Sequence, residues 1–254
     1  MKEINFNNQV KIRFYFTEPD NFILSKSSML FDCLKSIQNN TSRYDKDLFK
    51  NMIIEVYENN YSNSPFNNNH AVGYSEAWQN KILIKESVFS SIDSLSDLLS
   101  HEIGHYRAYK TGFDDTKHFM RKELDRIRSI DSNAKISVSE LVAEDFYYYY
   151  GVDKYSKGVF RTNQEHPHLN PDNVKGLKAF YDIFGIIYKF TTENFNLSYG
   201  QIKNTKFTYD NNYCSVEFEY HLFGLFSMDR YKIDINGIYK RNGFNGRYDL
   251  IKAI

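Results

Sequence analysis

Short apolar runs separated by polar residues indicate three β-strands in the first ninety positions of the chain. In residues 9–16 the apolar side chains fall on every second position, which is the period of a half-buried strand. Residues 51–58 and residues 81–85 are short runs rich in branched apolar residues, which also favours strands. Residues 26–37 repeat their apolar side chains with the period of a helix, and residues 59–69 form an Asn-rich loop.

A longer helix is predicted directly after these strands. Ser91 and Asp93 are both residue types that cap the first turn of a helix, and Gly112 is the type that commonly follows the last turn. Between them, apolar side chains recur every three or four positions and would form one buried stripe, made up of Leu95, Leu98, Leu99 and Ile103.

Three more helices are expected between this helix and the tail of the chain. Residues 116–130 carry apolar side chains on one side and charges on the other, and residues 139–150 continue to a stop at Gly151. A further helix begins near residue 170, with Pro171 in its first turn, and runs to about Tyr188.

The tail of the chain changes from helical to strand-forming patterns at about residue 189. Turn residues there separate three β-rich runs, at residues 206–209, 214–220 and 231–235. The order of elements predicts an α+β fold. We expect one domain over residues 1–188, followed by a small all-β module over residues 189–254.

The composition allows a large core but indicates no charged partner. Of the 254 residues, 41% are hydrophobic and 17% are aromatic, so a sizeable core can be buried. The 32 basic and 32 acidic residues leave a formal net charge of zero, which gives no reason to expect nucleic acid or an anionic membrane as a partner. Cys33 and Cys214 are too few to build a disulfide framework.

The sequence does not fix the compartment or the oligomeric state. The first residues lack the apolar region of a secretory signal, and no stretch approaches the length of a membrane span. The protein is therefore expected to work in the cytosol, or to be exported by another route or after removal of a signal.

The strongest chemical signal is the sequence His101-Glu102-Ile103-Gly104-His105 in the predicted helix. A spacing of four places both imidazoles on one helix face, where two neutral imidazoles can bind one Zn²⁺. Glu102 lies beside the open coordination position and can serve as general base. With 7 His in 254 residues, chance produces this motif in roughly one chain in a hundred, and the small Gly104 would let another element approach closely.

A catalytic zinc needs a third protein ligand, and the helix predicted over residues 139–150 offers Glu140 and Glu144 on one face. Glu140 would coordinate zinc, while Glu144 would accept a hydrogen bond from a ligating imidazole. The sequence also allows simpler roles, because Glu140 fits a capping box at the helix start and Glu144 could be a solvated surface residue. The metal interpretation requires one zinc ion per chain.

Two segments resemble the gluzincin group of metallopeptidases, and in particular the anthrax lethal factor-like family. That family combines an HExGH helix with a glutamate helix of the form ExxAExF, matched here by residues 101–105 and 140–146. Weaker likenesses are His166-Pro167-His168 and residues 176–180, so the resemblance covers about residues 50–188. It implies a zincin-like domain, with a small twisted sheet over the active-site helix and a helical lower lobe. It also implies Glu140 as the zinc ligand and Glu144 behind the ligands.

One departure from the family concerns the group that stabilises the oxyanion of the transition state. Lethal factor-like peptidases carry a catalytic tyrosine shortly before the glutamate helix, but residues 130–139 contain none. The remaining candidates are His166, His168 and one tyrosine of the 147–150 run, and the sequence does not choose among them.

The expected activity is hydrolysis of a peptide or protein substrate. In zincins the substrate usually pairs with an edge strand of the sheet, and residues 81–85 are the candidate edge here. Tyr74 and Trp78 could line a pocket beside it, although aromatic burial favours Trp78 as a core residue. Two alternatives stay open: a zinc amidohydrolase acting on cell-wall or other non-protein amides, and a catalytically weak zincin-like binding protein.

Overall fold

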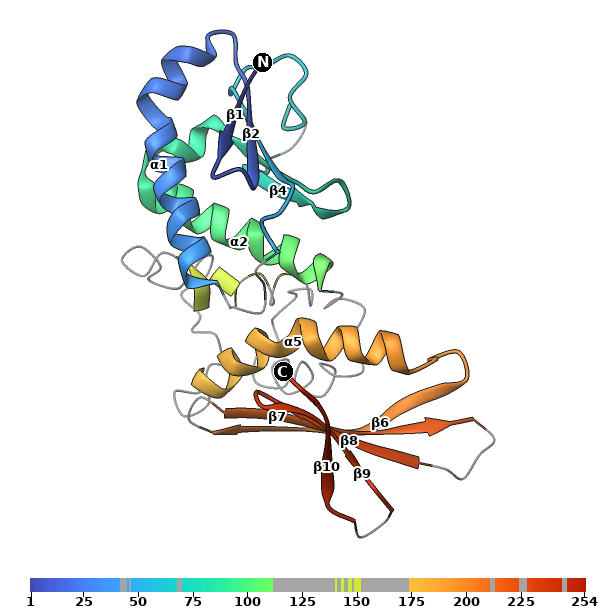
Figure 1. The fold of residues 1–254 in the computed structure, drawn as a ribbon. Coiled ribbons are helices and arrows are strands. Elements are labelled where there is room, and N and C mark those ends of the chain that lie inside the picture. Colours follow the sequence, from blue (N-terminus) through green and yellow to red (C-terminus); the bar gives the residue numbers. More distant parts are fainter. Residues whose placement is uncertain are drawn as a thin grey trace. The chain divides into compact units, whose positions relative to one another are not determined.

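The chain divides into two compact units, one formed by residues 1–110 and 136–163 and the other by residues 111–135 and 164–254. Helices and two separate sheets are both present, which confirms the α+β class. The computed structural model describes the following residues (Figure 1): 1–41, 45, 47–67, 70–111, 140, 143, 146, 147, 149–151, 174–210, 213–223, 228–243 and 246–254.

The first unit is built on a mixed five-stranded sheet. Its strands are β1 (Lys2–Phe6), β2 (Val10–Tyr15), β3 (Met52–Tyr57), β4 (Gly73–Glu76) and β5 (Lys81–Lys85). Their order across the sheet is β1-β2-β3-β5-β4. The three central strands run parallel to one another, and each outer strand pairs antiparallel with its neighbour.

Two long helices share the hydrophobic core of this unit with the central strands. They are α1 (Pro19–Asn40) and α2 (Ile92–Lys110), which contact each other. Alternate side chains of the central strands, such as Ile12, Ile54 and Ile82, are fully buried in one cluster with Leu34 and Leu99 of the helices. This period of two is why the strands could be predicted from apolar spacing.

The predicted elements at residues 9–16, 26–37, 51–58 and 81–85 are all confirmed, but the expected edge strand is wrong. β5 (Lys81–Lys85) lies inside the sheet, because it pairs with β3 on one side and with β4 on the other. The edge strand on this side of the sheet is therefore β4, which the sequence did not predict. With only four residues and one glycine, β4 carries too short a pattern to be recognised.

The two aromatic residues near this edge also differ from expectation. Tyr74 packs with Tyr57, Phe66 and Leu83 in a small cluster, and its ring centroid lies 5.3 Å from that of Phe66. The preceding Gly73 faces Leu98 of α2, so Tyr74 points to the opposite face of the sheet and lines no pocket beside α2. Trp78 is 63% exposed, so its interpretation as a core residue is wrong.

The second unit combines one helix with an antiparallel sheet. The helix is α5 (Val174–Asn194), and the strands are β6 (Gly200–Asp210), β7 (Tyr213–Leu222), β8 (Met228–Asp234), β9 (Gly237–Arg241) and β10 (Tyr248–Ala253). Each strand pairs with the next along the chain. The three predicted β-rich runs correspond to β6, β7 and β8, whereas β9 and β10 were not predicted.

The helix α5 packs against this sheet, whereas the sequence analysis placed most of its residues in the first domain. The helix contacts β7 and β6, and the ring of Phe190 lies 5.8 Å from that of Tyr231 in β8. Phe195, just after the helix, packs edge to face on Phe218. The helix belongs with the second unit, so this division differs from the expected boundary at residue 188.

The helices that the structure describes include none with the length and apolarity needed to cross a membrane. The helix predicted over residues 116–130 lies outside the described residues, and so do Gly112 and the predicted start of α5 near residue 170.

Candidate metal centre

The helix that carries the two histidines, α2, has a capped start and a buried stripe. Ser91 is the capping residue: its Oγ accepts a hydrogen bond from the Ser94 amide at 3.1 Å, and its carbonyl accepts one from the Leu95 amide at 3.2 Å. Of the two predicted caps, the structure therefore selects Ser91. The predicted stripe of Leu95, Leu98, Leu99 and Ile103 is buried. This packing holds the turn with the metal motif rigidly against the sheet.

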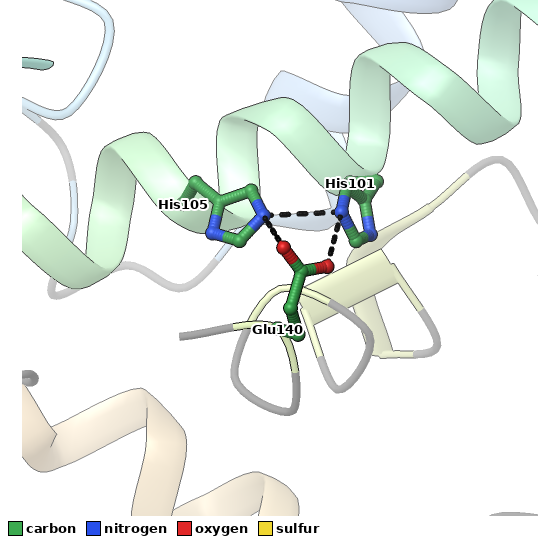
Figure 2. A group of neighbouring side chains, drawn as sticks. All are labelled: His101, His105 and Glu140. Atoms are coloured by element: carbon green, nitrogen blue, oxygen red, sulfur yellow. Dashed lines mark hydrogen bonds and ion pairs between the residues drawn. The ribbon is translucent and has the colours of Figure 1, made fainter. Parts of the chain in front are cut away.

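His101 and His105 project from one face of α2 toward a common point (Figure 2). Their Nε2 atoms lie 3.1 Å apart, and their rings meet edge to face. The side chain of His101 is 2% exposed and that of His105 is 18% exposed. Of the two imidazoles, that of His105 is therefore the more accessible to water.

Glu140 supplies a third donor group at the same point. Its Oε2 lies 3.3 Å from Nε2 of His101, and its Oε1 lies 3.5 Å from Nε2 of His105 (Figure 2). Hydrogen bonds with His101 and His105 hold the pKa of the Glu140 carboxyl well below its usual range, so the group is an anion. The capping alternative for Glu140 would involve residues 137–139, which lie outside the described residues.

The three donor groups fit a zinc ion. A tetrahedral zinc with ligand bonds of about 2.0–2.1 Å holds its donor atoms about 3.3 Å apart. The observed separations of 3.1, 3.3 and 3.5 Å match the edges of such a tetrahedron. Within the described residues, this is the one set of three His, Cys, Asp or Glu side chains whose donor atoms gather this closely.

Close contact between two helical segments brings Glu140 to the histidines. The described residues Glu140, Ala143, Phe146, Tyr147, Tyr149 and Tyr150 are helical, and we call them the glutamate segment. A Cβ atom at Gly104 of α2 would lie 2.7 Å from Cα of Ala143 and 2.9 Å from Cβ of Phe146. Only glycine permits this approach, as the sequence suggested for position 104.

Further along the glutamate segment, a hydrogen bond fixes its distance from α2. The Tyr147 hydroxyl donates to Oδ1 of Asp97 at 2.7 Å, and Tyr147 is only 2% exposed. Asp97 stands one helical turn before His101. The bond therefore links the turn that carries the first histidine to the segment that carries Glu140.

A buried ion pair lies next to the end of the glutamate segment. Nε of Arg107 donates to Oδ2 of Asp45 at 2.7 Å, with both side chains almost fully buried. The Arg107 guanidinium also lies 5.7 Å from the centre of the Tyr150 ring. At the adjoining Gly151, the carbonyl accepts a hydrogen bond of 2.7 Å from the Asn40 side chain of α1. Contacts to both helices of the unit thus hold this segment.

The tyrosines described here are poorly placed to stabilise an oxyanion. Tyr147 and Tyr150 are 2% and 0% exposed, and the hydroxyl of Tyr149 is buried. None of these three hydroxyls is open to a substrate. The other residues predicted for the site, Glu144, His166 and His168, lie outside the described residues, as does Tyr148.

Sequence reasoning missed the residues that hold the glutamate segment in place. Asp45 is 62 positions from Arg107, and Asp97 is 50 positions from Tyr147, so no local spacing connects these partners. Tyr109 is a further residue of α2 that the sequence reasoning did not consider. It stands four residues after His105 and therefore continues the face of α2 that carries both histidines.

Comparison with known proteins gives no further guide: no family model matches the chain, and neither does a curated protein or a solved structure.

Proposed function

We propose that this chain is a zinc-dependent metallopeptidase of the gluzincin type, with a zincin-like fold in its first unit. The observation that carries the proposal is the convergence of two imidazole nitrogens and one carboxylate, with Glu102 following His101 directly in α2. A structural zinc site is usually closed by four protein ligands, whereas a catalytic site has three and keeps one position open. Three ligands and a neighbouring glutamate favour catalysis.

In this proposal His101, His105 and Glu140 hold the zinc ion. When bound, zinc supplies Lewis-acid chemistry, lowering the pKa of a coordinated water and polarising the carbonyl of the scissile bond. The anionic state of Glu140 suits this role, because a carboxylate must lose its proton to bind a metal. Burial of His101 and the contact of Gly104 with Ala143 fix the positions of the groups that would bind the ion.

Glu102 is the proposed general base. It follows His101 directly, so its side chain leaves α2 about 100° around the helix axis from that histidine. Its exposure of 5% limits contact with bulk water, which strengthens its interaction with a developing charge. The carboxylate takes a proton from the attacking water and gives it to the departing nitrogen.

The proposed substrate is an extended peptide that pairs with β4. This strand ends the sheet, and no other described strand pairs with its far side. A Cβ atom at Gly73 would lie 2.8 Å from Cδ2 of Leu98, so the strand lies directly against α2, one turn before Glu102. Backbone pairing with this edge would supply affinity with little dependence on side chains.

The test compares peptide hydrolysis by the zinc-loaded protein and by Glu102→Gln. We expect a mixed peptide pool to be cut by the wild type, and the variant to keep its zinc but lose at least about a hundredfold in rate, as removal of a general base does. Glu193→Gln removes an exposed carboxylate of α5 and serves as the matched control. Near wild-type hydrolysis by Glu102→Gln would refute the mechanism. Hydrolysis of cell-wall fragments but of no peptide would favour the amidohydrolase alternative.

A further inference from the structure

Two large aromatic side chains of the first unit are exposed on two elements that contact each other, α2 and the 3₁₀ helix after β4. Trp78 is 63% exposed and Tyr109 is 53% exposed. Burying an aromatic side chain is strongly favourable, so two such residues exposed on contacting elements favour the binding of an apolar group.

Tyr109 lies on the same face of α2 as the metal ligands. His101, His105 and Tyr109 are spaced four residues apart, and residues at this spacing stack along one side of a helix. With a rise of 1.5 Å per residue, Tyr109 stands about 6 Å beyond His105 along the helix axis. The face that holds the metal therefore continues directly into an exposed phenol ring.

Trp78 reaches the same end of α2 from the edge of the sheet. It lies in η2 (Ala77–Gln79), a short 3₁₀ helix that follows β4 directly and contacts α2. Asn80, the next residue after η2, accepts hydrogen bonds from the Lys110 ammonium and, at 3.5 Å, from the Tyr106 hydroxyl. These bonds fasten η2 to the last turn of α2, which is the turn that carries Tyr109.

The charges of η2 and of the last turn of α2 indicate which kind of side chain would bind beside Trp78 and Tyr109. Neither residues 77–80 nor residues 106–110 contain an acidic side chain, and Arg107 is buried in its pair with Asp45. The remaining charge in the two segments is the exposed Lys110, which disfavours a basic side chain nearby. Two aromatic faces without a carboxylate suit an apolar or aromatic side chain.

We propose that Trp78 and Tyr109, named here the aromatic wall, bind a large apolar side chain of the substrate and so determine cleavage specificity. This inference rests on the proposed peptidase function. The metal would lie between His101 and His105, so Tyr109 stands about 9 Å from it along α2. An extended peptide advances about 3.3 Å per residue, which places the selected side chain within about three residues of the scissile bond.

The kinetic test uses acetylated, amidated peptides that are identical except for one residue, which is Phe, Ala or Lys and occupies each position in turn. We expect the wild type to prefer Phe over Ala by about tenfold in kcat/KM at one position near the scissile bond. Trp78→Ala and Tyr109→Ala each reduce this ratio severalfold, whereas Tyr109→Phe retains it because the ring stays in place. Tyr199→Ala, which removes a 70% exposed tyrosine of the second unit, is the matched control.

Two kinetic results would overturn the aromatic wall. The first is a Phe-to-Ala ratio that neither alanine variant changes. The second is a Phe-to-Ala ratio that falls as far in Tyr109→Phe as in Tyr109→Ala. The preference for Phe would then depend on the hydroxyl of Tyr109 and not on its ring.

A binding measurement tests the aromatic wall independently of peptidase activity. Trp78 is the only tryptophan in the chain, so its fluorescence reports on the wall alone. In zinc-loaded Glu102→Gln, the Phe peptide should shift this emission to shorter wavelength, and the Ala peptide should not. If the wild type cuts no peptide, the peptidase proposal fails and the emission alone decides: a shift with the Phe peptide supports the wall, and no shift overturns it.

Discussion

Replacing Gly104 with alanine places one methyl group between the two helical segments that form the metal centre. The new Cβ atom would lie 2.7 Å from Cα and 2.8 Å from the carbonyl oxygen of Ala143, and 2.9 Å from Cβ of Phe146. Carbon atoms in good contact are about 3.5–4.0 Å apart, so the segments must separate by about 1 Å. Backbone atoms of Ala143 cannot rotate away as a flexible side chain would.

The expected damage is larger for zinc binding than for stability. Overpacking costs about 1–3 kcal/mol, but alanine is favoured over glycine inside a helix by about 1 kcal/mol, so the net loss of unfolding free energy is about 0–2 kcal/mol. Glu140 precedes Ala143 by one turn and moves with it. Metal sites tolerate only about 0.2 Å in ligand distance, so we expect zinc affinity to fall by about ten- to a hundredfold.

Zinc titration in competition with a chelating dye, together with urea unfolding, measures both quantities on the same protein. Ser28→Ala adds a good helix former at an exposed position of α1 and is the control. Zinc affinity equal to that of the wild type in Gly104→Ala would refute the reasoning, because the contact with Ala143 would then have no role in placing Glu140.

Three further predictions concern the same unit. Asp45→Asn should lower the unfolding free energy in urea by about 3–5 kcal/mol, because it removes the negative charge that pairs with the buried guanidinium of Arg107. Tyr147→Phe removes the hydrogen bond to Asp97 and should cost about 1 kcal/mol in the same assay. Zinc at a hundredfold excess over its dissociation constant should stabilise the wild type by about 2.7 kcal/mol, and the resulting rise in melting temperature should be absent in His105→Ala.

Each of these predictions has a matched control and a contrary outcome. Asp47→Asn removes an exposed carboxylate and should have little effect; equal losses in Asp47→Asn and Asp45→Asn would contradict the role of the buried pair. Tyr199→Phe removes an exposed hydroxyl for comparison with Tyr147→Phe, and equal stabilities of those two variants would show that the bond to Asp97 contributes nothing. His70→Ala, at an exposed position, should keep the zinc-dependent rise.

The helical part of the site could be predicted because its geometry is local. A spacing of four is enough to place His101 and His105 on one face, and the apolar stripe of α2 indicates which face is buried. Glu140 was reached by a different route, from the need for a third ligand and from a resemblance in residues 140–146. Its approach to the histidines agrees with that expectation.

The features that could not be predicted from the sequence depend on contacts between distant segments. The edge of the sheet went unrecognised, because the order of strands is set by pairing and not by the pattern within β5. For the same reason Trp78 was interpreted as a core residue, although it lies in a turn after the true edge strand. The assignment of α5 to the second unit follows from the packing of Phe190 on the later sheet, which spacing within the helix does not encode.

Zinc content after equilibration and removal of free metal tests the central claim most directly. We predict about one zinc per chain in the wild type and in Glu102→Gln, and little or none in His105→Ala and Glu140→Ala, as expected for a three-ligand site that loses one donor. His70→Ala should match the wild type. A wild-type protein without zinc, or variants lacking His105 or Glu140 that retain it in full, would contradict the metal centre proposed here.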